Sequence, residues 1–155
     1  MFAAADALDM VALHVSRVTA VLHVTPSRAT LEMFVPDGGL MHVATTSRID
    51  LSPVRGAWVT TAPATGRALL VLGTVLSDNR LPLIQFWHRR RQVRGRLHRL
   101  GSFWLGEAVG ARLRLEVDDG AHVTTAKSGW GTGAVPLHQS RTRLTRPLRT
   151  PWETS

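Results

Sequence analysis

The chain of 155 residues contains no cysteine and no tyrosine, and Lys127 is its only lysine. Without cysteine, the protein cannot use disulfides, thiolate catalysis or cysteine-ligated zinc. Its longest apolar run, residues 68–76, is far shorter than the roughly 20 residues that a membrane-spanning helix needs. The first residues carry acids, where a secretory signal carries positive charge. We therefore expect a cytoplasmic protein with no membrane association.

Acidic residues are scarce in the second half of the chain. Residues 1–79 carry five basic residues and six acids, a net charge of −1, whereas residues 80–155 carry fourteen basic residues and five acids, a net charge of +9. This imbalance predicts that the second half meets nucleic acid, nucleotide phosphate or an acidic protein surface. GC-rich codon usage is the competing explanation for arginine in place of lysine.

The hydrophobic pattern predicts a mainly β protein. Turn residues recur about every 8–12 positions, which favours a single small β-barrel or β-sandwich-like domain. Residues 68–76 are apolar on both faces and so predict a central, buried strand. In residues 111–117 alternation directs Leu113, Leu115 and Val117 inward. The other expected strands cover residues 29–35, 40–46, 57–61, 81–87 and 121–126.

The two ends of the chain show different patterns. Apolar residues at helical spacing over 6–22 favour a helix, whereas the β-branched residues of 15–24 favour a strand. We expect a short N-terminal helix that runs into a strand ending before Pro26. Residues 1–135 are expected to form one domain, with 1–87 and 88–135 as sub-modules, and residues 136–155 a disordered basic tail. Contacts from that tail are expected from Arg141, Arg143, Arg146 and Arg149.

An arginine cluster at residues 88–99 is the strongest candidate for a site. Guanidinium groups match phosphate oxygens as planar forks of donors, so we expect this cluster to hold phosphate. An extended conformation would place Arg90, Arg94 and Arg96 on one side, and two glycines argue against a helix. Phe86, Trp87, Phe103 and Trp104 flank the cluster, either as stacking platforms for bases or as core residues. The candidate phosphate-binding residues are Arg89, Arg90, Arg91, Arg94, Arg96 and Arg99.

Two segments of this region resemble motifs of the PilZ family. Arg90-Arg91-Gln92-Val93-Arg94 matches its R-x-x-x-R motif, and Ala126-Lys127-Ser128-Gly129-Trp130-Gly131 keeps the serine and glycine of its D/N-x-S-x-x-G motif. Residues 60–135 therefore resemble a degenerate or truncated PilZ domain preceded by the small β-module of flagellar-brake-type proteins. The resemblance implies a cyclic di-GMP receptor, with Arg90, Arg94, Ser128 and Gly131 as ligand residues.

Other chemistry has little support in the sequence. None of the seven histidines is paired with another at the i, i+4 spacing of a helical metal site. Residues 129–133 are glycine-rich but lack the lysine of a phosphate loop. We expect a non-enzymatic binding protein without catalytic residues, metal or cofactor. Nucleic acid is the simplest partner, and the alternatives are a cyclic dinucleotide receptor and an assembly protein of a phage particle or ribonucleoprotein.

Overall fold

The computed structural model describes residues 7–46, 53–62, 66–129 and 131–141, which form β-strands and no helix. A helix of the length and apolarity that crosses a membrane is accordingly absent from this part of the chain. The strands are β1 (Ala7–Ala12), β2 (Thr19–Val24), β3 (Ala29–Phe34), β4 (Leu40–Thr46), β5 (Gly56–Ala62), β6 (Gly66–Thr74), β7 (Leu83–His88), β8 (Arg91–Val93), β9 (Arg96–Leu100), β10 (Phe103–Val109), β11 (Leu113–Asp118), β12 (His122–Lys127), β13 (Gly133–Ala134) and β14 (His138–Arg141).

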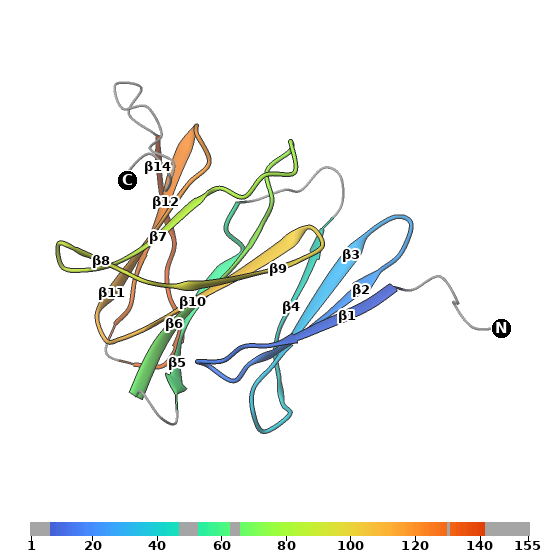
Figure 1. Ribbon diagram of the computed structural model, residues 1–155, viewed down its shortest axis with the longest axis horizontal. Helices are drawn as coiled ribbons and strands as arrows, with labels where there is room; N and C mark the ends of the chain where they lie inside the picture. Colours follow the sequence, from blue (N-terminus) through green and yellow to red (C-terminus); the bar gives the residue numbers. More distant parts are fainter. Residues whose placement is uncertain (1–6, 47–52, 63–65, 130, 142–155) are drawn as a thin grey trace.

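The strands form three antiparallel sheets that stack as layers (Figure 1). The N-terminal sheet has the order β1-β2-β3-β4, the central sheet β13-β5-β6-β10-β9, and the outer sheet β14-β12-β11-β7-β8. Over the described residues none of the sheets closes into a barrel. The protein is therefore mainly β, as the sequence predicts, with stacked sheets instead of a barrel.

Both faces of the central sheet are buried. Leu70, Leu72 and Leu105 pack in a core shared with the N-terminal sheet. Leu69, Val71 and Trp104 pack in a second core shared with the outer sheet. The apolar run 68–76, expected to be a central strand, supplies most of β6, which lies between β5 and β10. That prediction is confirmed, because a strand with a core on each side needs apolar residues at successive positions.

The expected N-terminal helix is wrong for the described residues. Residues 7–12 and 19–24 form β1 and β2, which pair with each other as the first two strands of the N-terminal sheet. Alternation explains the outcome, since Ala20 and Leu22 are buried on the inner face of β2 while the alternate residues Val21 and His23 are only half-buried. The β-branched side chains pack well on this pleated surface and are restricted in a helix.

Other predicted strands are found close to their expected positions. β3 and β4 pair as a hairpin across the turn at 35–39, with Leu31 and Met33 buried. β11 buries Leu113, Leu115 and Val117, as its alternation predicts. Residues 138–141, expected in the basic tail, form β14, which pairs with β12 because its backbone completes the edge of the outer sheet.

A buried carboxylate attaches the turn between β1 and β2 to the central sheet. Glu107 of β10 is fully buried. Its Oε1 accepts a hydrogen bond from the backbone N–H of Val15 at 2.9 Å, and its Oε2 accepts one from the N–H of Ser16 at 3.0 Å. The carboxylate therefore satisfies two amides of a turn that is more than ninety residues away in the sequence.

Candidate anion-binding surface

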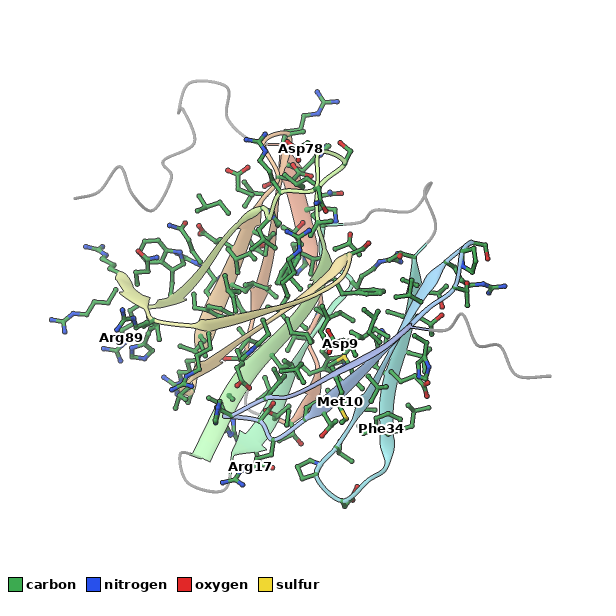
Figure 2. The ribbon with its side chains drawn as sticks, turned by 45° about the vertical axis from the view of Figure 1, so that its right-hand side comes forward. Asp9, Met10, Arg17, Phe34, Asp78 and Arg89 are labelled. Carbon is green, nitrogen blue, oxygen red and sulfur yellow. The ribbon has the colours of Figure 1, made fainter. Side chains whose placement is uncertain are left out.

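The arginine cluster lies where the chain passes from the outer sheet to the central sheet. β7 and β8 form a hairpin with Arg89 and Arg90 at its turn, and β8 is the edge strand of the outer sheet. The chain then crosses through Arg94 and Gly95 to β9, the edge strand of the central sheet. Figure 1 shows the β7–β8 hairpin projecting from the stacked sheets, and Figure 2 shows Arg89 at its tip.

The cluster is extended, but it is not one continuous strand. Arg90 lies in the turn, Arg94 in the crossing, and Arg96 and His98 on β9. The even-numbered positions therefore do not share a single strand face. The turn and the crossing bring the arginines together around one corner of the molecule instead.

Five arginines at this corner are exposed and carry unopposed charge. Within the described residues, none of their guanidinium groups takes part in a hydrogen bond or an ion pair. Edge strands often carry basic residues that discourage pairing with another chain, which is the simplest structural role for these side chains. Five unopposed charges are also a candidate anion site. We call this set the arginine corner: Arg89, Arg90, Arg91, Arg94 and Arg96.

Arg99 differs from the other predicted phosphate ligands because its guanidinium has hydrogen-bond partners within the chain. Its guanidinium donates hydrogen bonds to the backbone oxygen of Gly101 at 3.2 Å, and to the backbone oxygen and Oδ1 of Asn79 at 3.2 and 2.6 Å. The two bonds to Asn79 hold the turn between β6 and β7 against β9. Three of the five N–H donors of the Arg99 guanidinium are thereby occupied.

The outer sheet adds two basic residues that the cluster in the sequence does not include. In the pairing register, Gln92, Trp87, Arg114 and Lys127 form one row across β8, β7, β11 and β12. The guanidinium carbon of Arg114 lies 5.9 Å from the Trp87 ring centroid, and its Nη2 lies 3.3 Å from Oε1 of Glu116. Alternation in residues 111–117 predicts that Arg114 points outward. It does not predict which residues of the paired strands lie next to Arg114.

The flanking aromatic residues divide between core and surface. Phe86, Phe103 and Trp104 are buried, and the indole N–H of Trp104 donates to the backbone oxygen of Thr74 at 3.0 Å. Only Trp87 of these four is half-buried on the outer face of its sheet. Of the two interpretations of these aromatics, core packing holds for three, and Trp87 alone is available for stacking.

Two of the four residues implied by the PilZ resemblance, Arg90 and Ser128, lie at the same end of the outer sheet. The Oγ of Ser128 accepts a hydrogen bond from the N–H of Leu113 at 2.7 Å, and Leu113 pairs with His88 beside the arginine turn. Strand β8 and the end of β12 are separated by three strand spacings, roughly 14 Å. Gly131 is exposed. Arg141 lies in β14, whereas Arg143, Arg146 and Arg149 lie outside the described residues.

Comparisons with known proteins and a search for metal ligands add no assignment. No family model, curated protein or solved structure matches the chain. Among the described residues, no three histidine or acidic side chains are close enough together to hold a metal ion.

Proposed function

We propose that this protein is a non-enzymatic binding protein that holds the phosphates of a nucleic acid at the arginine corner. The observation that carries the proposal is the group of five exposed guanidiniums, Arg89 to Arg91 with Arg94 and Arg96, for which the described part of the chain supplies no acidic partner. Concentrating like charges costs free energy by repulsion, and an anionic partner removes that cost.

A polymeric phosphate partner fits the spread of these charges. The corner extends from the hairpin turn through the crossing to β9, and the row with Arg114 and Lys127 continues it over the outer sheet. A single phosphate engages one or two guanidiniums as forked pairs. A chain of phosphates can engage many of them at once, and releases bound counterions as it does so.

The test compares two variants that lose equal charge. Replacing Arg90 and Arg91 with alanine should weaken binding of an oligonucleotide of about 12 nucleotides by roughly tenfold at low salt, measured by fluorescence anisotropy. The matched control carries Arg17→Asn and Arg28→Ala, both exposed in the loops that precede β2 and β3 of the N-terminal sheet. Asparagine suits position 17 because Arg17 has a φ of 60°. Equal loss of affinity in both variants would contradict a localised site.

A cyclic dinucleotide is the second candidate ligand, favoured by the position of both PilZ-like motifs at one end of the outer sheet. In this case Arg90 and Arg94 would grip the phosphates and guanines of cyclic di-GMP. Calorimetry should then show saturable heat with the parent protein and much less with Arg90→Ala or Arg94→Ala. Absence of heat with the parent protein excludes this candidate.

A further inference from the structure

A groove of about 210 Å³ runs beside the arginine corner, where the chain crosses between the outer and central sheets. Apolar side chains of Ile84, Phe86, Val93 and Leu97 line it, together with Gln85, Gln92, Arg94 and Gly95. The groove therefore combines apolar side chains and two side-chain amides with a guanidinium that has no partner among the described residues.

Two glycines let the backbone approach the floor of this groove. A Cβ atom at Gly95 would lie 2.6 Å from the Phe86 ring, closer than side chains tolerate. At Gly106 of β10, a Cβ would lie 3.0 Å from Leu97 and 3.4 Å from Phe86. The close fit of Phe86 and Leu97 against these glycines fixes the floor and one wall of the groove.

Leu97 is 47% exposed on β9 and lines the groove beside Arg94. Exposed leucine on an edge strand loses the free energy that burial would give it. A ligand that covers Leu97 with an apolar surface and meets Arg94 with negative charge would recover that free energy. Such a ligand is apolar on one part and anionic on the adjoining part.

The size of the groove restricts the apolar part of that ligand. Pockets for drug-sized molecules have volumes of about 300–1,000 Å³, so this one suits a single small ring system. A nucleotide unit of a single strand offers a flat base next to a phosphate. In a duplex the faces of the bases are stacked inside and only their edges face the grooves, so a base would first have to be flipped out.

We propose that this groove seats an unpaired base of single-stranded nucleic acid while the arginine corner holds the adjoining phosphates. This inference rests on the proposed function and specifies its substrate as a single strand. The apolar side chains of the groove can contact the face of any base, so this contact depends little on sequence.

Three probes of equal length separate base binding from phosphate binding: a thymidine strand of about 12 nucleotides, an abasic strand with the same number of phosphates, and a duplex. The parent protein should bind the thymidine strand about tenfold more tightly than the abasic strand. Leu97→Trp, which fills the groove without changing charge, should bring the two affinities together.

The matched control is Leu40→Trp, which makes the same substitution at another exposed leucine, 59% exposed on β4. Leu97→Ala, which removes the wall without adding bulk, is the second variant and should also reduce the difference.

Each outcome decides between the two proposals. Equal affinity of the parent protein for the thymidine and abasic strands overturns the groove as a base site and leaves the phosphate-binding function standing. An undiminished preference for the thymidine strand in both Leu97 variants, with wild-type circular dichroism, also overturns the groove. If the parent protein binds none of the three probes, the proposed function itself fails.

Discussion

At the scale of single residues, Glu107 links the β1–β2 turn to the central sheet through two hydrogen bonds of its buried side chain. Replacing it with glutamine keeps the shape but changes one acceptor oxygen into an NH₂ group, which then faces the N–H of Val15 or of Ser16. We expect Glu107→Gln to lower the free energy of unfolding by about 1–3 kcal/mol, because a buried amide loses its acceptor. Urea denaturation followed by tryptophan fluorescence measures this change.

Glu116→Gln is the matched control for that substitution. Glu116 contacts Arg114 on the half-buried outer face of β11, and we expect its loss to change the free energy of unfolding by about 0–1 kcal/mol. A change as small in Glu107→Gln would show that the contact between Glu107 and the turn contributes little to stability.

His42 should make the stability of the protein depend on pH. Burial, with the positive charge of Arg55 adding to it, lowers the pKa of His42 below its ordinary value, and its ring lies 4.9 Å from that of Trp58. The unfolded chain therefore binds more protons than the folded chain in mild acid. The free energy of unfolding should fall as pH drops through about 6.5 toward the lower folded pKa.

Urea denaturation of the parent protein and of His42→Gln, across about pH 8 to pH 5, isolates this contribution. The variant should lose less stability on acidification than the parent protein. His14→Gln, at an exposed turn residue, controls for the removal of an imidazole as such. Identical pH profiles for the parent protein and His42→Gln would contradict the prediction.

At the scale of elements, one substitution in the turn of the β7–β8 hairpin should raise stability and weaken oligonucleotide binding. Arg89 has a φ of 56°, in the left-handed region that side chains other than glycine seldom adopt. Glycine adopts this conformation without strain, so Arg89→Gly should raise the free energy of unfolding by about 0.5–1 kcal/mol. The same change removes one unopposed guanidinium and should weaken oligonucleotide binding.

Thermal denaturation and anisotropy measured on the same Arg89→Gly sample test this opposition. Arg112→Gly is the comparison, because Arg112 has a φ of 58° but lies on another turn. Unchanged oligonucleotide affinity in Arg89→Gly would remove Arg89 from the proposed phosphate site.

The strands that were predictable from sequence are those with a local signal. β3 and β11 alternate cleanly, and β6 is apolar on both faces, so each was expected near its observed position. β10 was not expected, because Glu107 and Gly106 interrupt its apolar pattern. The amides that make Glu107 acceptable in a buried strand come from the distant β1–β2 turn, and no local pattern reveals them.

In the candidate site too, the features with a local sequence signal were predictable and those that depend on distant contacts were not. Sequence density identified the arginines of residues 89–96, and the extended conformation was correctly favoured over a helix. It could not separate Arg99, whose guanidinium is held by Asn79, because that contact depends on how the loop after β6 folds back. Nor could the sequence place Arg114 and Lys127 in one row with Trp87, since that row exists only through the register of the paired strands.

At the scale of the whole molecule, the uneven distribution of charge should determine how binding responds to salt. Residues 80–155 carry a net charge of +9 while residues 1–79 carry −1. Each phosphate contact on a single strand contributes about −0.7 to the slope of log K against log salt concentration. If all five members of the arginine corner contact phosphate, the slope should approach roughly −3.5.

Anisotropy titrations of a thymidine strand at several salt concentrations measure this slope. Replacing Arg90 and Arg91 together should make it shallower by about 1.4, whereas the Arg17→Asn and Arg28→Ala control should leave it unchanged. Leu97→Trp should lower affinity without altering the slope, because it removes a base contact and no phosphate contact. A slope near zero in the parent protein would mean that its charge does not drive binding, and the arginine corner would then be a solvated edge that only discourages pairing with other chains.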